Sequence, residues 1–162
     1  MEKMGEVKVL FVCLGNICRS PLAYGVGKKM AAQERSLKVV VDSAGTCDHH
    51  AGDTAHHGSV AVARKRGIDI TDHRARKVRK SDFDEFDYIV AMDASNLRDL
   101  KRKCPPEHAH KLSLLLAHSE QHRGEDVPDP YYGHPSFEVV FDIVEDGVRG
   151  FFSSVLATRP NA

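Results

Sequence analysis

Short apolar runs alternate along this chain with segments of helical character. Four of the runs have the length and the β-branched or aliphatic content of buried strands, at residues 7–12, 39–41, 88–91 and 112–115. Nearly continuous apolar strands separated by helices are typical of a parallel sheet that helices cover on both faces. The sequence therefore predicts an α/β fold, in which ligands bind at the carboxyl ends of the strands.

The helical segments carry signals of their own. Residues 22–32 form the first, and a second around residues 59–66 stops at Gly67, as helices often do. Asp93 can cap a third helix. A long amphipathic helix is predicted towards the end of the chain, where apolar core residues recur at helical spacing: Phe137, Val140, Phe141, Val144, Val148, Phe151, Phe152 and Val155.

Length and charge limit the remaining possibilities. A chain of 162 residues can bury a core without staples, so we expect a single domain over residues 1–162. Lys plus Arg and Asp plus Glu both total 23, which leaves no overall field to attract nucleic acid. A basic run at residues 73–80 is followed at once by acidic residues between 82 and 87. We interpret this segment as a solvated face and expect no nucleic-acid partner.

The apolar runs and the cysteines bear on the cellular compartment. No run approaches the length of a membrane span, and no signal peptide is recognisable, so we expect a cytoplasmic protein without a membrane span. The four cysteines do not resemble the disulfide framework of a small secreted domain, and free thiols in a reducing compartment fit them better. They are Cys13, Cys18, Cys47 and Cys104.

The segment Cys-Leu-Gly-Asn-Ile-Cys-Arg-Ser at residues 13–20 lies between the first predicted strand and the first predicted helix. Backbone N–H groups can converge on an anion at such a place. The segment lacks the Gly-Lys-Ser/Thr of nucleotide-binding loops, and instead it begins with Cys13 and ends with Arg19. We therefore interpret it as a phosphate-binding loop with a nucleophile at its start, in which the anion is surrounded by Leu14, Gly15, Asn16, Ile17, Cys18 and Ser20.

Four residues of this loop have predicted roles in catalysis or in holding the loop. A helix N-terminus, N–H donors and a nearby arginine favour the thiolate of Cys13, which is the nucleophilic form. The planar fork of Arg19 can hold two phosphoryl oxygens during in-line transfer. Ser20 can donate its hydroxyl to the sulfur, and Asn16 tolerates the left-handed backbone of a sharp curl. Taken singly, each residue would suit an ordinary strand end or helix start, but the C-x5-R-S pattern favours catalysis.

A second motif, Asp-Pro-Tyr-Tyr-Gly at residues 129–133, supplies the acid that such chemistry needs. A phenolate leaving group requires a proton that thiolate attack does not provide. The flanking prolines stiffen the backbone around Asp129, which would first protonate the leaving oxygen and later accept a proton from water. Tyr131 and Tyr132 could wall a deep slot for a phenyl ring. Without the Cys13 loop, this motif would suit an ordinary proline-rich turn.

Together these residues resemble the low-molecular-weight protein tyrosine phosphatases, and the resemblance runs essentially end to end. It implies a Rossmann-like, three-layer α/β/α domain of the phosphotyrosine protein phosphatase I type, with a central four-stranded parallel sheet. It also implies catalysis by Cys13, Arg19 and Asp129 without a metal or an organic cofactor. The motifs that carry the resemblance are Val-Cys-Leu-Gly-Asn-Ile-Cys-Arg-Ser-Pro at 12–21, Asp-Ser-Ala-Gly-Thr at 42–46, Phe-Asp-Tyr-Ile at 86–89, Met-Asp at 92–93 and Asp-Pro-Tyr-Tyr-Gly at 129–133.

The resemblance also implies supporting residues and partners. Ser43 and His73 would join Asn16 and Ser20 in a hydrogen-bonded network that holds the loop. The substrate would be a phosphotyrosine-containing protein and the product inorganic phosphate; bacterial members often act on autophosphorylated tyrosine kinases of polysaccharide export. Mammalian relatives carry a pocket-wall tryptophan six residues after the serine that matches Ser43. This chain has His49 there, so the substrate preference of those relatives does not transfer directly.

Histidine pairs and a second loop cysteine suggest further chemistry. The pairs at residues 49–50 and 56–57 could indicate a metal site, but adjacent histidines on a loop rarely converge on one ion. We expect these histidines to be solvent-exposed and not to bind a functional metal. Cys18 lies close enough in sequence to form a disulfide with an oxidised Cys13, which would protect the nucleophile from irreversible oxidation.

Two other functions compete with hydrolysis. A thiol-dependent arsenate reductase shares the C-x5-R loop but needs two further downstream cysteines, and Cys47 and Cys104 do not form such a pair. A phosphotyrosine-binding module without turnover would need neither a nucleophile nor an acid, whereas this chain has Cys13, Arg19 and Asp129. Metal-free hydrolysis of an aryl phosphate that is lost in Cys13→Ser separates the enzyme from the binding module.

Overall fold

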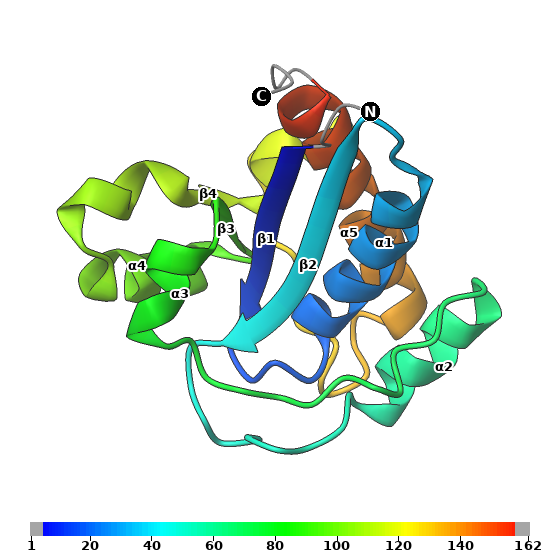
Figure 1. The fold of residues 1–162 in the computed structure, drawn as a ribbon. Coiled ribbons are helices and arrows are strands. Elements are labelled where there is room, and N and C mark those ends of the chain that lie inside the picture. The colour runs from blue at the N-terminus through cyan, green and yellow to red at the C-terminus, as the bar shows by residue number, and fades with distance from the viewer. Residues whose placement is uncertain (1–4, 158–162) are drawn as a thin grey trace.

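The computed structural model describes residues 5–157, so the first four and last five residues of the expected domain lie outside it. Its centre is a four-stranded sheet in which all neighbouring strands are parallel, in the order β2-β1-β3-β4 (Figure 1). The predicted α/β fold is therefore confirmed. The strands are β1 (Gly5–Cys13), β2 (Leu37–Gly45), β3 (Tyr88–Ala91) and β4 (Leu112–Leu114).

Helices pack against both faces of the sheet (Figure 1). One face packs against α1 (Arg19–Gln33) and α5 (Phe137–Phe151), on which α2 (His57–Lys65) packs in turn, and the other against α3 (Lys80–Glu85) and α4 (Ala94–Lys103). No helix among residues 5–157 is both long enough and apolar enough to cross a bilayer. Shorter helical turns complete the chain at Pro106–Lys111, Leu115–His118 and Phe152–Leu156.

The central strand β1 explains why the first apolar run is nearly continuous. Side chains alternate between the two faces of a strand. Val9 and Phe11 pack with α1 and α5 in the larger core cluster, whereas Leu10 and Val12 pack with α3 and α4 in the smaller one. All four side chains are fully buried. Because both faces of β1 are covered along this stretch, no position in it can be polar without an internal partner.

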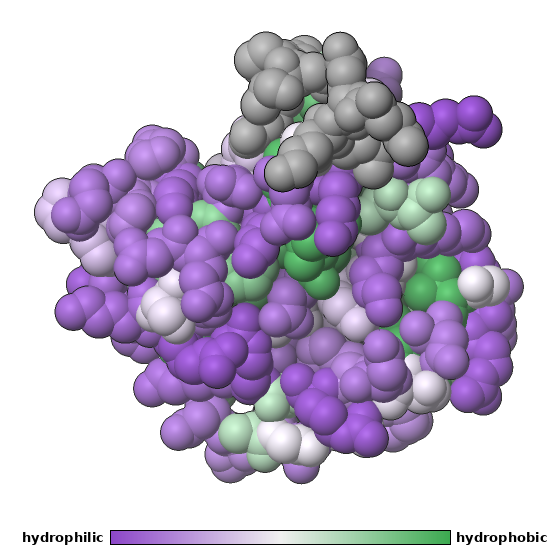
Figure 2. Space-filling model, in the orientation of Figure 1, coloured by the Kyte–Doolittle hydropathy of each residue, from purple (hydrophilic) through white to green (hydrophobic). Residues whose placement is uncertain are grey.

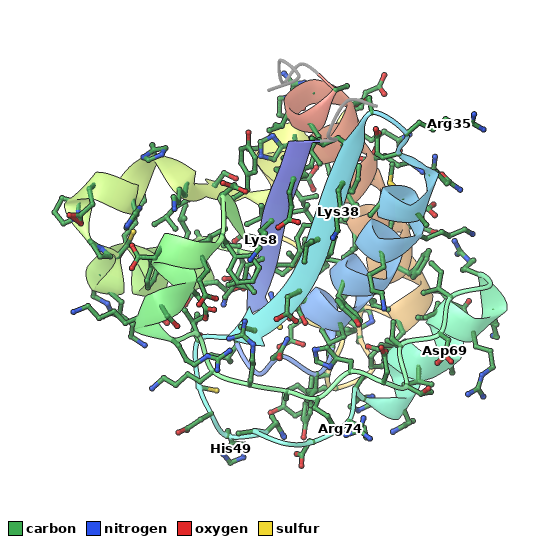
Figure 3. The ribbon with its side chains drawn as sticks, in the orientation of Figure 1. Lys8, Arg35, Lys38, His49, Asp69 and Arg74 are labelled. Atoms are coloured by element: carbon green, nitrogen blue, oxygen red, sulfur yellow. The ribbon has the colours of Figure 1, made fainter. Side chains whose placement is uncertain are left out.

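Part of the second face differs from the expectation of complete cover. In Figure 1, no helix of the described chain lies in front of β1 and β2, and Lys8 and Lys38 come from these strands (Figure 3). The same face is mainly hydrophilic in Figure 2. The edge strand β2 is only partly buried from Val39 to Asp42. Charged side chains on an edge strand discourage pairing with other chains, which gives a physical reason for this composition.

Element boundaries depart from the sequence prediction where tertiary contacts extend them. The second strand is predicted only over residues 39–41, but β2 is nine residues long because each residue pairs with β1. The first helix begins at Arg19, one turn before the predicted segment. Asp93 caps α4 as predicted, since its carboxylate accepts a hydrogen bond from the Asn96 N–H. The sequence does not predict α3, whose six residues are too few to show a helical period.

The prediction of a solvated face for the charged segment is wrong for several of its residues. Asp82 has no exposed surface, and Phe83 and Phe86 are buried in the smaller core cluster. Arg76 reaches Asp82 with a nitrogen to oxygen distance of 2.9 Å, which neutralises the buried carboxylate. The segment therefore contributes an internal ion pair to the domain, close to the end of the sheet where β2 terminates.

Candidate active site

The predicted phosphate-binding loop lies at the carboxyl ends of the strands. Cys13 is the last residue of β1, and the loop leads directly into α1 at Arg19. Ser43 lies near the end of β2, and Asp93 follows β3. The chain leaves β1 for β2 on one side, while β3 lies on the other side. The loop thus occupies the switch point of the sheet, where α/β folds bind ligands.

The sulfur of Cys13 accepts hydrogen bonds from its own loop. Its Sγ lies 3.0 Å from Ser20 Oγ and 3.3 Å from the backbone nitrogen of Asn16, and the side chain is almost fully buried. Ser20 Oγ already accepts a hydrogen bond of 2.8 Å from Asn16 Nδ2, so the serine proton is free to point at the sulfur. Two donors directed at one sulfur favour the thiolate, because hydrogen bonds to a charged form stabilise it.

Asn16 is the hub of the hydrogen-bonded network under the loop. It is the only described residue other than glycine with a positive φ, 59°, and it is fully buried. Its Nδ2 donates to Ser20 and, at 3.0 Å, to Ser43 Oγ, while its Oδ1 accepts from the Arg76 N–H at 3.0 Å. Ser43 Oγ also lies 2.6 Å from His73 Nε2. The structure therefore brings together the four residues of the expected network.

Arg19 is fixed in place before any ligand binds. Its NH1 donates to Asp93 Oδ2 at 2.7 Å and to the Val127 carbonyl at 3.0 Å, and its side chain is only 5% exposed. Burial alone would lower the pKa of Arg19, but the neighbouring Cys13, Asp93 and Asp129 outweigh burial and raise it. The guanidinium stays charged, and with NH1 occupied its remaining edge can hold two phosphoryl oxygens.

Asp93 has a second role that the sequence interpretation missed. Its Oδ1 caps α4, as predicted, while its Oδ2 forms the ion pair with Arg19. The only signal in the sequence was the Met-Asp motif directly after the third strand, at residues 92–93. A carboxylate that follows a parallel strand lies at the same edge of the sheet as the loop after β1. We infer that Asp93 orients the guanidinium.

Asp129 lies at the mouth of the loop, although it is distant from Cys13 in sequence. Its Oδ2 is 3.9 Å from Arg19 NH2, and its Oδ1 accepts a hydrogen bond of 3.0 Å from the Tyr131 N–H. The side chain is 46% exposed. A carboxyl group so placed is accessible to a leaving group and to water, and it also lies beside the guanidinium that would bind the phosphoryl group.

A pocket of about 380 Å³ opens above the loop. The His50 ring packs against the loop: a Cβ built on Gly15 would lie 3.1 Å from its Cδ2. His49, the predicted wall, also lines the pocket and is labelled near the bottom of the molecule in Figure 3, while the His50 centroid lies 6.2 Å from that of Tyr131. Counting residues from the sequence therefore missed one wall of the slot. The lining comprises Cys13, Leu14, Gly15, Ile17, Cys18, Arg19, Cys47, His49, His50, Asp129, Tyr131 and Tyr132.

The histidine pairs are less exposed than the sequence suggested. His50 and His56 are half-buried, so the expectation of solvent exposure is wrong for one member of each pair. His56 caps α2 by accepting a hydrogen bond of 3.0 Å from the Gly58 N–H, and burial together with His57 lowers its pKa. Among residues 5–157, no three His, Cys, Asp or Glu side chains gather as a metal site would require.

The two buried thiols of the loop differ in their surroundings. Burial, aided by the charges of Asp129 and Cys13, raises the pKa of Cys18 to about 12. Cys18 therefore stays a neutral thiol near pH 7, and only Cys13 has donors directed at its sulfur. All four cysteines are free, so the disulfide with Cys13 stays a prediction. Cys47 also lines the pocket, which the sequence did not indicate.

Gly45 allows β2 to approach the loop closely, and this predicts a sensitive position. A Cβ at residue 45 would lie 2.6 Å from the Leu14 carbonyl oxygen and 3.1 Å from the Asn16 side chain. Gly45→Ala must therefore displace the loop backbone. We expect kcat/KM for an aryl phosphate to fall by roughly tenfold to a hundredfold, because small misplacements of reacting groups are costly.

The matched control for Gly45 lies at the other end of the paired strands. A Cβ at Gly5 would make an ordinary contact of 3.4 Å with Leu37. We expect Gly5→Ala to keep wild-type kinetics. Wild-type kcat/KM in Gly45→Ala would contradict the close packing of β2 on the loop.

The sequence model of a family described as low molecular weight phosphotyrosine protein phosphatase matches residues 8–161. The chain is 39% identical over 150 residues to the low molecular weight protein-tyrosine-phosphatase YfkJ of Bacillus subtilis, covering 92% of this chain and 96% of YfkJ. It is 46% identical over 143 residues to the low molecular weight phosphotyrosine protein phosphatase of Gallus gallus, covering 85% and 89% of the two chains.

Solved structures of phosphatases have the same fold as this chain. The crystal structure of YfkJ matches with a TM-score of 0.88 and 37% identity, covering 98% of this chain and 99% of that one. A protein tyrosine phosphatase from Entamoeba histolytica, crystallised with Hepes in the active site, matches with a TM-score of 0.87 and 39% identity, covering 93% and 97%. Both similarities extend over nearly the whole of each chain.

Proposed function

This chain belongs to the low molecular weight phosphotyrosine protein phosphatase family, and from that membership we propose that it hydrolyses phosphotyrosine through a phosphocysteine on Cys13. The observation that carries the proposal is the meeting of three groups at one pocket. The sulfur of Cys13 with its two donors, the fixed guanidinium of Arg19 and the carboxyl group of Asp129 all line it. A phosphoryl group held by the loop would lie between the nucleophile and the acid.

In the first step, the Cys13 thiolate attacks phosphorus and the bond from phosphorus to the phenolic oxygen breaks. Protonated Asp129 gives its proton to that oxygen, so tyrosine leaves as a neutral phenol. Arg19 and the backbone N–H groups of the loop hold the equatorial oxygens, whose charge they match. The product of this step is phosphocysteine, and Asp129 is left as a carboxylate.

In the second step, water attacks the phosphocysteine and the bond from phosphorus to sulfur breaks. Asp129 takes a proton from the water as it attacks, which restores the acid for the next cycle. The departing thiolate of Cys13 regains the hydrogen bond from the Ser20 hydroxyl, 3.0 Å away. Inorganic phosphate then leaves, and no step requires a cofactor.

The rim of the pocket supports an aromatic substrate presented by a protein. Three large apolar side chains of the pocket lining are exposed to solvent: Leu14 at 48%, Tyr131 at 41% and Tyr132 at 91%. Such a rim can contact the residues around a phosphotyrosine. We propose a phosphotyrosine-containing protein as partner and the cytoplasm as its location. An autophosphorylated bacterial tyrosine kinase is the first candidate to test, because the relative YfkJ is bacterial.

The Tyr131 ring predicts selectivity for phosphotyrosine. With His50 it bounds the slot, and the shorter phosphoserine side chain would not reach both the ring and the loop. We expect the wild type, in the presence of EDTA, to release phosphate from a phosphotyrosyl peptide much faster than from a matched phosphoseryl peptide. Tyr131→Ala should lose about tenfold in kcat/KM for the phosphotyrosyl peptide only, as expected for one lost aromatic contact.

The control for this experiment is Tyr88→Phe on β3, where the partly buried ring packs on Phe151 against the larger core cluster and does not line the pocket. It should leave the ratio of the two peptides unchanged. Equal rates on both peptides in the wild type would contradict a phosphotyrosine slot. A binding module would release no phosphate from either peptide, and EDTA-dependent loss of activity would contradict the metal-free mechanism.

A further inference from the structure

Asn16 belongs to a closed ring of hydrogen bonds that extends beyond the pocket. The Arg76 N–H donates to Asn16 Oδ1 at 3.0 Å, and Asn16 Nδ2 donates to Ser43 Oγ at 3.0 Å. The Ser43 N–H donates to Asp42 Oδ1 at 2.8 Å, and Asp42 Oδ2 accepts from Arg76 NH2 at 3.2 Å. The ring therefore begins and ends at Arg76, which does not line the pocket.

The guanidinium of Arg76 connects its own segment of the chain to α3 and to β2. Its NH1 and NH2 donate to the two oxygens of Asp82 at 2.9 and 3.2 Å, in the first turn of α3. Its NH2 also reaches Asp42 on β2. Asp82 has no exposed surface, and Arg76 is 23% exposed. A buried bidentate pair fixes the position of the arginine, because moving it would leave a carboxylate unpaired in the interior.

The backbone around Arg76 is also paired to β2, so the anchored side chain sets where its N–H points. The Gly45 N–H donates to the Arg76 carbonyl at 2.8 Å, and the Val78 N–H donates to the Gly45 carbonyl at 2.9 Å. The Arg76 N–H is thereby held facing the loop. Among the described residues it is the one donor to Asn16 Oδ1, and a buried amide oxygen needs one.

We propose that Arg76 is a positioning residue for the nucleophile, because its backbone N–H fixes the orientation of the Asn16 side-chain amide. With Oδ1 held by Arg76, both Nδ2 protons face Ser20 and Ser43. Ser20 must then accept from Asn16, and its own proton points to the sulfur of Cys13. This inference rests on the proposed roles of Cys13 and Ser20 in catalysis.

A misplaced Arg76 would reverse the direction of the hydrogen bond between Asn16 and Ser20. If Oδ1 lost its donor, the Asn16 amide could turn over and present an oxygen to Ser20. Ser20 would then donate to that oxygen and could no longer donate to the sulfur, since a hydroxyl has one proton. The thiolate of Cys13 would be stabilised less, both before attack and as it leaves phosphorus. Breakdown of the phosphocysteine should suffer most, because the thiolate is the leaving group in that step.

The test replaces Arg76 with lysine, which can neutralise Asp82 but cannot bridge two carboxylates. We expect Arg76→Lys to fold and to lose about tenfold in kcat for p-nitrophenyl phosphate, the loss typical of one misdirected hydrogen bond. A burst of p-nitrophenol should precede the steady state, because breakdown of the intermediate becomes slower. The pH midpoint for inactivation by iodoacetamide should also rise.

Two further variants separate positioning from general stability. Asp42→Ala opens the ring at a half-exposed carboxylate while leaving the pair of Arg76 with Asp82 intact. It should reproduce the burst and the shifted midpoint, with a smaller loss of kcat. Arg66→Lys is the matched control, because Arg66 forms a 2.8 Å ion pair with Asp142 that has no contact with the loop. It should match the wild type in all three readouts.

The outcomes for Arg76 and for the enzyme mechanism are distinguishable. If the wild type turns over while Arg76→Lys and Asp42→Ala keep its kcat, burst and inactivation profile, the positioning role is overturned and the proposed function stands. A lowered melting temperature with unchanged kinetics would overturn it equally, since that is the behaviour of a structural residue. Absence of Cys13-dependent turnover in the wild type would instead overturn the proposed function.

Discussion

Cys13→Ser is expected to abolish hydrolysis of both phosphotyrosyl peptides and p-nitrophenyl phosphate. The hydroxyl is a far weaker nucleophile than a thiolate, and the groups that hydrogen-bond to the sulfur, the Ser20 hydroxyl and the Asn16 N–H, are donors that would not activate a hydroxyl at residue 13. The rate should fall by at least about ten thousandfold, as for other catalytic nucleophiles. Phosphate release in a continuous assay with EDTA measures the loss.

The matched control is Cys18→Ser, in the same loop. Burial raises the pKa of Cys18 to about 12, so its thiol is not the nucleophile and a hydroxyl of similar size should preserve most of the activity. Cys13→Ser should still bind a phosphotyrosyl peptide, because Arg19 and the loop N–H groups are unchanged. Loss of activity in Cys18→Ser with retention in Cys13→Ser would assign the chemistry to the other thiol.

Asp129→Ala should have the second largest effect, and its size should depend on the leaving group. Removing a general acid typically costs ~100 to 10,000-fold. A poor leaving group such as phenol or tyrosine needs the proton most, whereas p-nitrophenol leaves readily without it. We therefore expect a steep loss of kcat/KM with phenyl phosphate and a much smaller one with p-nitrophenyl phosphate, measured across a series of substituted phenyl phosphates.

Binding of phosphate provides the internal control for Asp129. Arg19 remains fixed by Asp93 and the Val127 carbonyl, so competitive inhibition by inorganic phosphate should stay near the wild-type value. Asp142→Ala removes a carboxylate outside the pocket and should behave as the wild type. Equal losses on good and poor leaving groups would contradict the role of Asp129 as acid.

The sequence predicted the parts of this protein that are set by local pattern. The third strand has the predicted bounds, and the first phosphate-loop residue, Cys13, ends β1 where the apolar run stops. Asp93 was predicted as a helix cap because a cap depends on neighbours within one turn. The loop could be interpreted for the same reason, since the eight consecutive residues 13–20 carry most of its chemistry.

The features that the sequence did not predict depend on contacts between distant segments. The sequence predicts a solvated face for Arg76 and Asp82, because charged runs usually form one. Only the packing of α3 shows that Asp82 is buried. His50 was missed because a count of residues along a loop does not reveal which ring turns towards Gly15. The ion pair of Arg19 with Asp93 joins the segments after β1 and β3, and no local pattern encodes that contact.

Direct capture of the intermediate is the decisive measurement. A phosphotyrosyl peptide is mixed with the wild type or with Asp129→Ala, the reaction is quenched with acid within its first turnovers, and the digested protein is analysed by mass spectrometry. A phosphoryl group should be found on the peptide that contains Cys13, and it should be absent from Cys13→Ser. Release of phosphate with no adduct at residue 13, or an adduct on another side chain, would contradict hydrolysis through this sulfur.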